Sequence, residues 1–304
     1  MTIFLKSLKN RGYLDGLSMT IAQIGSRKLS EKDDYGSQEW HTFAPNLTIY
    51  GFDADADACE AANADLDRRK INWTERHIPL VLSDAIGEAI LYVTKHPMCS
   101  SLYPPNEVYL GRLAGLSELV NLDFTVELET TTLDAFCKSE DIQEIDFLQI
   151  DVQGADLDVL KGAANLLAHS VLAIQIEVEF APLYSGQPLF SDIDFFLRPR
   201  GFTLFELTHA YRHRAISPIY GNMHRGQLLW GDAFYLRDLL DSVVNPLFKT
   251  PKQMLKLACI ADIFGFSDFT FEMLSYLTSH YGEEPKFDFR EPIDESLRHL
   301  SHPN

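Results

Sequence analysis

The chain of 304 residues is poor in basic residues, paired cysteines and long apolar runs. Lysine and arginine number 26 against 44 aspartates and glutamates, and the formal net charge is −18. This balance argues against nucleic acid or an anionic membrane as the main partner, because both need a basic surface. The four cysteines form no C-x-x-C pair, so neither a zinc knuckle nor a disulfide framework is indicated. No stretch approaches a membrane span and the N-terminus lacks a signal-peptide core, so we expect a cytoplasmic protein.

A strand, a glycine turn and a helix are predicted within IDFLQIDVQGADLDVLKG, residues 145–162. The apolar run from Phe147 to Val152 is too short for a helix and is closed by Gly154, which is typical of a strand buried on both faces. Helical spacing of apolar residues then predicts one amphipathic helix that ends near His169. Asp151 lies at the carboxyl end of the strand, where open parallel sheets bind their ligands. The alternative is that Asp151 only caps the helix.

Strands and helices alternate along most of the chain, which predicts a three-layer α/β sandwich. The other predicted strands are Met19–Ile24, Thr48–Phe52, His77–Leu82, Glu88–Thr94, Phe124–Thr131 and residues 171–180, 202–207 and 226–238. Weak helical character extends over Glu31–Ala44, and the loop from residue 98 to 113 is a candidate substrate lid. From Asp241 onward only helices are predicted, followed by a polar tail with prolines. We therefore expect a main domain over residues 1–240 and a small helical extension over residues 241–304.

Small and acidic residues follow the first three predicted strands. Gly25 ends the first strand, Asp53 ends the second, and Ser83 and Asp84 follow the third. An acid at the end of the second strand can accept hydrogen bonds from both hydroxyls of an adenosine ribose. The G-x-G-x-x-G fingerprint is absent, so a nicotinamide oxidoreductase is disfavoured but adenosine binding is not.

Two glutamates lie on one face of the strand over residues 171–180. Glu177 and Glu179 share that face because side chains alternate along a strand. A buried charge costs several kcal/mol unless it is paired, so the two need partners or a wet cleft. We expect at least one to face the active site; the alternative is pairing with Arg198, Arg200 or Arg212.

Two stretches resemble the FkbM-type methyltransferases, which are S-adenosylmethionine enzymes of the seven-stranded Rossmann-like class. They are IDFLQIDVQGADLDVLKGA and EVEFAPLYSGQPLFSDIDFFLRPRGFTLFEL, and the strongest similarity covers Thr125–Arg237. The resemblance implies a three-layer Rossmann-like class I methyltransferase sandwich with S-adenosylmethionine as the cofactor. It also implies methylation of a hydroxyl on a sugar or small metabolite. The expected partner is therefore a small-molecule or glycan acceptor, with no nucleic acid and no membrane.

The resemblance also implies roles for the residues at the strand ends. Gly25 matches the glycine that approaches the cofactor's methionine part, and Asp53 matches the acid that binds the ribose. Ser83 and Asp84 occupy the position that usually meets the adenine. Asp151 lies next to where the reactive methyl group is expected.

The first loop departs from the family pattern of D-x-G-x-x-G. Gln23 stands where the family has an acid, and the second glycine is missing. Gln23 can still orient backbone groups through its amide, so we retain it as a cofactor-binding residue. Arg27 and Lys28 add positive charges near the expected sulfonium. These features favour an alternative function, a non-catalytic binding or assembly module that keeps the fold.

A carboxylate within hydrogen-bond reach of the acceptor hydroxyl can serve as general base. The candidates are Asp151 first, Glu177 second and Glu179 third. His209 is a weaker candidate, and His209 and His213 share a helix face only if that segment is helical. No third ligand accompanies the two histidines, so we predict no metal site.

Overall fold

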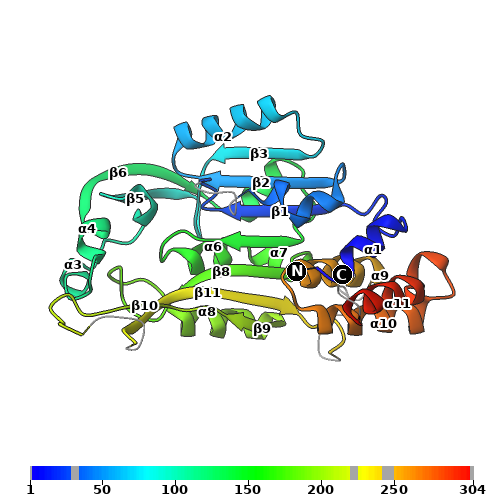
Figure 1. The fold of residues 1–304 in the computed structure, drawn as a ribbon. Helices are drawn as coiled ribbons and strands as arrows, with labels where there is room; N and C mark the ends of the chain where they lie inside the picture. Colours follow the sequence, from blue (N-terminus) through cyan, green and yellow to red (C-terminus); the bar gives the residue numbers. More distant parts are fainter. Residues whose placement is uncertain (1, 29–33, 220–224, 242–249, 302–304) are drawn as a thin grey trace.

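The computed structural model describes residues 2–28, 34–219, 225–241 and 250–301. Its main sheet has eight strands in the order β10-β11-β8-β7-β1-β2-β3, with β9 also paired to β11 (Figure 1). The strands are β1 (Met19–Ile24), β2 (Leu47–Asp53), β3 (Thr74–Pro79), β7 (Phe147–Ile150), β8 (Ala173–Glu179), β9 (Phe202–Leu207), β10 (Ala210–Arg212) and β11 (Gln227–Arg237). The strands from β8 to β3 run parallel, whereas β11 is antiparallel to β8. The order reverses at β1, so β1, β2 and β7 bring their carboxyl ends together at a topological switch point.

Both faces of the sheet are covered by helices. Along β1, Met19 and Ile21 point to one face and Ala22 and Ile24 to the other. The first face packs against α1 (Leu5–Asn10), η2 (Tyr35–Ser37), η3 (Glu39–Phe43), α9 (Pro251–Ile263) and α10 (Ser267–Tyr281). The second packs against α5 (Leu133–Ser139), α6 (Asp156–Gly162), α7 (Ala164–His169) and α8 (Phe190–Leu197). Helix α2 (Ala56–Arg69) lies beside β2 and β3. The three-layer α/β arrangement is therefore confirmed.

The C-terminal helices are tied to the sheet and to the N-terminus by buried polar contacts. The Lys256 Nζ of α9 lies 2.8 Å from Asp146 Oδ1 at the start of β7, and both side chains are buried. Near the C-terminal end of α9, Asp262 accepts hydrogen bonds from the backbone N–H groups of Phe4 and Leu5, each at 2.8 Å. The division of the chain at residue 240 into two domains stays a prediction.

Several predicted boundaries were wrong. The strand His77–Leu82 is two strands, because β3 ends at Pro79, which has no N–H for the ladder, and β4 (Val81–Leu82) joins a second sheet. The single helix after Asp151 is divided into α6 and α7 near Gly162. The polar tail contains a further helix, α11 (Arg290–Ser301). The segment 31–44 holds the short 3-10 helices η2 and η3, and its residues 31–33 lie outside the described part.

A second sheet of three strands, in the order β4-β6-β5, lies beside the carboxyl ends of the parallel strands of the main sheet (Figure 1). Its strands β5 (Gly87–Thr94) and β6 (Leu122–Thr131) form an antiparallel pair that we call the β5–β6 ribbon. The connection between them contains η4 (Pro97–Cys99), α3 (Glu107–Leu110) and α4 (Leu116–Val120). In Figure 1 this ribbon and the helices α9, α10 and α11 lie at opposite ends of the molecule.

Candidate functional site

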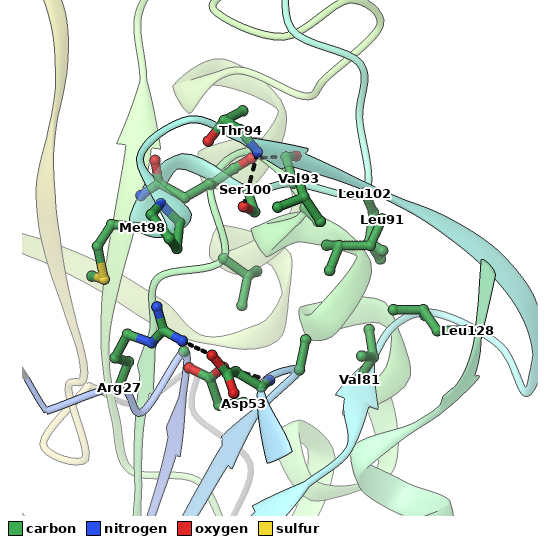
Figure 2. A pocket seen from close by; sticks show the side chains of 18 of the residues that line it. Arg27, Asp53, Val81, Leu91, Val93, Thr94, Met98, Ser100, Leu102 and Leu128 are labelled. Carbon is green, nitrogen blue, oxygen red and sulfur yellow. Dashed lines mark hydrogen bonds and ion pairs between the residues drawn. The ribbon is translucent and has the colours of Figure 1, made fainter. Parts of the chain in front are cut away.

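The ends of three neighbouring strands open onto one cavity of about 590 Å³, which we call the strand-end cavity. Gly25 follows β1, Asp53 ends β2 and Asp151 follows β7, and all three line it. The β5–β6 ribbon and the segment 94–102 form the opposite side, so that Leu91, Val93 and Leu102 lie across the cavity from Asp53 (Figure 2). The volume is in the range of small-molecule sites.

The loop after β1 has room only for glycine at position 25. Gly25 has a φ of +82°, and a Cβ atom there would lie 1.9 Å from the carbonyl oxygen of Asp151. The N–H groups of Gly25 and Ser26 both donate to the carbonyl of Phe52, at 2.9 Å. The backbones after β1 and β7 therefore touch directly and form the floor of the cavity.

The two positive charges of the first loop are neutralised by acids. Arg27 forms an ion pair with Asp55, and Lys28 Nζ lies 2.6 Å from Glu75 Oε1. Asp53 accepts a hydrogen bond from the Asp55 N–H at 2.8 Å. Burial raises the pKa of the Asp53 carboxyl, and the nearby Arg27 charge acts in the opposite direction. Arg27 thus pairs with Asp55 and partly offsets the effect of burial on Asp53.

A buried polar chain holds the first loop to β3. Ser26 Oγ lies 3.0 Å from His77 Nδ1, and His77 Nε2 lies 3.1 Å from Glu75 Oε1. Burial disfavours ionisation of Glu75, but hydrogen bonds from His77 and Lys28 outweigh it and lower its pKa to about 2. Gly51 makes room for this chain, because a Cβ atom there would lie 2.4 Å from His77 Nδ1.

The Ser26–His77–Glu75 chain resembles a nucleophile triad in composition only. Ser26 is 5% exposed and His77 is 3% exposed, and neither lines the strand-end cavity. A nucleophile has to reach its substrate. We therefore interpret the hydrogen bonds among Ser26, His77 and Glu75 as a support that fixes the loop carrying Gly25.

Gln153 joins the two predicted catalytic acids. Its Nε2 donates to Asp151 Oδ1 and to Glu177 Oε2, each at 2.7 Å. Its Oε1 accepts from the Tyr184 hydroxyl at 3.2 Å, and its carbonyl accepts from the Ser101 hydroxyl at 2.6 Å. Gln153 has a φ of +55°, a left-handed conformation that is uncommon for residues with a side chain. Strain of this kind is often retained where it places a functional group.

Two of the acids around Gln153 have raised pKa values. Burial and then the adjacent Asp151 charge raise the pKa of Glu177 well above its ordinary value. Burial, with Asp151 again next, raises the pKa of Asp156 to about 7. The protonated form of Glu177 is therefore favoured relative to an ordinary glutamate, and Glu177 makes a hydrogen bond with Asp151. Sites in which neighbouring carboxyl groups have different pKa values are typical of acid–base catalysis.

Only Asp151 of the two predicted catalytic residues lines the strand-end cavity. Glu177 lies behind it, linked through Gln153, and Glu179 is buried with its Oε2 atom lacking a hydrogen bond among the described residues. The alternative pairing with arginines is not seen in the described structure, because Arg198 bonds Asp194, Arg200 bonds the Phe196 carbonyl and Arg212 bonds the Tyr211 carbonyl.

The predicted cofactor residues divide into two groups. Gly25, Asp53 and Asp151 line the cavity, whereas Gln23, Ser83 and Asp84 do not. Gln23 is buried in β1 and its Oε1 has no hydrogen bond among the described residues. The chain segment before Ser83 contributes Leu80, Val81 and Leu82 to the lining instead. The roles given to all six residues stay predictions.

The histidines do not form the helical pair considered from the sequence. Residues 210–212 are strand β10, and the His209 ring makes an edge contact with Tyr211. The described residues contain no group of three or more histidines, cysteines or acids placed to hold a metal ion.

Sequence reasoning missed the residues that organise Asp151. Gln153, Tyr184 and Ser101 come from three separate segments, and a pattern along the chain gives no sign that they meet. The apolar ribbon face was also missed as a site surface. The alternation of apolar and polar side chains along β5 and β6 predicted strands, but it did not show which face of the ribbon lines the cavity.

The sheet order and the glycine turn after β1 are those of a Rossmann-like α/β sandwich of the class I methyltransferase type. The Methyltransferase FkbM domain matches residues 39–204, which is 166 of the 304 residues. The chain therefore belongs to the FkbM methyltransferase family.

Among curated proteins, the chain is 36% identical over 76 residues to the 2-O-methyltransferase NoeI of Sinorhizobium fredii. That match covers 25% of this chain and 31% of the relative. Among solved structures, the methyltransferase FkbM of Methylobacillus flagellatus is 14% identical with a TM-score of 0.36, over 74% of this chain and 47% of that one. TrmK of M. capricolum, solved with S-adenosyl-homocysteine, is 10% identical with a TM-score of 0.33, over 96% of both chains. Among the described residues, no helix is both long enough and apolar enough to cross a bilayer.

Proposed function

We propose that the chain is an S-adenosylmethionine-dependent methyltransferase that methylates a hydroxyl group of a sugar or another small metabolite. The observation that carries the proposal is the convergence of Gly25, Asp53 and Asp151 on one cavity. Membership of the FkbM family supports methyl transfer, and the partial likeness to a 2-O-methyltransferase supports a hydroxyl acceptor. The net charge of −18 favours a small molecule or glycan over nucleic acid.

The residues at the strand ends fit the proposed cofactor. The absence of a side chain at Gly25 lets the loop after β1 lie directly against the Asp151 backbone at the cavity floor, and the Asp53 carboxylate can accept hydrogen bonds from ribose hydroxyls. The apolar segment Leu80–Leu82 offers a surface for the adenine ring, with Ser83 and Asp84 next to it in the chain. Gln23 would orient backbone groups beneath the loop. When bound, the cofactor supplies a methyl group on a positively charged sulfur.

The acids beside the cavity supply a proton acceptor for the hydroxyl. Asp151 faces the cavity, so we assign it the role of general base, which would accept the proton of an acceptor hydroxyl placed beside it. Glu177 and the amide of Gln153 both form hydrogen bonds with Asp151 and orient it. Holding the reacting groups in line is the main contribution of the protein to such a displacement.

Isothermal titration calorimetry with S-adenosylmethionine and S-adenosylhomocysteine tests the cofactor site. Asp53→Asn is the informative variant and Asp57→Asn the matched control, because Asp57 is exposed in the first turn of α2 and does not line the cavity. We expect micromolar binding that Asp53→Asn weakens about 10- to 100-fold, since a hydrogen bond to a charged group contributes roughly 1.5–3 kcal/mol. Equal affinity of the two variants would contradict the assignment.

A non-catalytic binding or assembly module is the second candidate. The observation that favours it is Gln23, which replaces the family's acid and leaves a buried oxygen without a hydrogen bond among the described residues. No binding of either ligand at millimolar concentration would favour this candidate over the enzyme.

A further inference from the structure

One face of the β5–β6 ribbon is apolar and points into the strand-end cavity. Leu91 lies opposite Val126 and Val93 opposite Phe124 in the antiparallel ladder, so the four side chains share a face. All four line the cavity. Ile90 lies opposite Glu127 on the other face, and neither of these lines it.

The apolar face is incompletely covered by the described protein. Phe124 is 53% exposed and Val126 is 40% exposed, although both border the cavity. Burial of such surface is favourable by about 25 cal/mol per Å². A ligand that covers these side chains would gain that free energy.

The ribbon face and the polar floor belong to the same cavity. Asp53 and Arg27 lie on one side, and Leu91, Val93 and Leu102 lie on the other (Figure 2). The cofactor assigned above requires the floor, where Gly25, Asp53 and the segment Leu80–Leu82 meet. The ribbon side is then left for the molecule that must reach Asp151 from across the cavity, which is the acceptor.

We propose that the acceptor is amphiphilic: its hydroxyl lies beside Asp151, and it carries an alkyl chain or aromatic group that packs on Leu91, Val93, Phe124 and Val126. The placement of the hydroxyl rests on the function proposed above. The apolar face lines a concave cavity and the chain carries a net charge of −18, so a small molecule fits better than an anionic bilayer.

A series of alkyl β-D-glucosides tests the proposal without knowledge of the natural acceptor. Methyl, hexyl, heptyl and octyl glucoside are titrated by calorimetry below their micelle concentrations, with the protein saturated with S-adenosylhomocysteine. We expect the affinity to rise about fourfold for each added methylene from hexyl to octyl, because each buried methylene contributes about 0.8 kcal/mol. An affinity that does not change with chain length would overturn the proposal.

Val126→Ser and Ile90→Ser are matched variants, since the two residues are 40% and 44% exposed on opposite faces of the same ribbon. We expect Val126→Ser to weaken octyl glucoside binding about tenfold and Ile90→Ser to leave it unchanged. Equal effects of the two variants would overturn the proposal. Two other results would also overturn the proposal. They are co-sedimentation of the wild-type protein with phosphatidylcholine vesicles, or its dimerisation, if Val126→Ser abolishes that association and Ile90→Ser does not.

The cofactor titration separates the two proposals. Wild-type protein that binds no S-adenosylhomocysteine but shows the chain-length dependence would contradict the proposed enzyme and retain the apolar subsite. Cofactor binding without the chain-length dependence would contradict the apolar subsite and retain the proposed cofactor site.

Discussion

Replacement of Gly25 by alanine tests the contact that forms the cavity floor. The new Cβ atom would lie 1.9 Å from the Asp151 carbonyl oxygen, whereas ordinary contacts begin at 3.4 Å, so the two loops must separate by about 1.5 Å. The left-handed φ of +82° adds about 1–2 kcal/mol for a residue with a side chain. A displacement of about 1 Å can lower a rate by roughly 100-fold. We expect cofactor affinity, measured by calorimetry, to fall by a similar factor.

Gly265→Ala is the matched control for this variant. Gly265 has a φ of +85°, and a Cβ atom there would meet nothing within 4 Å. It therefore carries the conformational cost alone, and we expect a loss of about 1–2 kcal/mol in the free energy of urea unfolding with unchanged cofactor affinity. Equal cofactor affinity of the two variants would contradict the role of the Gly25–Asp151 contact.

Three further variants test the supports of the site. Lys256→Met leaves Asp146 buried without its cation, so we expect urea unfolding to show a loss of about 3–5 kcal/mol; a loss below 1 kcal/mol would contradict this. Ser26→Ala removes the hydrogen bond to His77. We expect weaker cofactor binding in calorimetry, with little change in the thermal midpoint of unfolding. Unchanged affinity would show that this hydrogen bond does not fix the loop. Burial raises the pKa of Glu177 in the folded state above its ordinary value of 4.5, so wild-type stability should fall as the pH rises above 4.5. Glu177→Gln should flatten that dependence in urea titrations at several pH values; parallel curves would contradict the raised pKa.

Strands β2 and β7 could be predicted because each is a short, mainly apolar run with an acid at its carboxyl end. Strand β3 was misplaced because its sequence, TERHIP, is mostly polar. Asp53 and Asp151 were identified by the same feature, since an acid directly after a buried strand must lie at the sheet edge. Their convergence with Gly25 on one cavity follows from the switch in strand order at β1.

Other features depend on contacts that no local pattern encodes. The left-handed conformation of Gln153 has no sequence signal, because such a backbone normally selects glycine or asparagine. Ser26 and His77 are 51 residues apart, and their contact exists only because β1, β2 and β3 pair in register. Helix α11 was missed because Pro292 suggested a tail, yet proline is tolerated in the first turn of a helix.

A crystal structure of the protein soaked with S-adenosylhomocysteine tests the central claim most directly. We expect electron density for the ligand in the strand-end cavity, with the ribose hydroxyls within hydrogen-bond distance of Asp53 and the sulfur beside Asp151. Ligand bound elsewhere, or an empty cavity in crystals grown at ligand concentrations that saturate binding in solution, would contradict it.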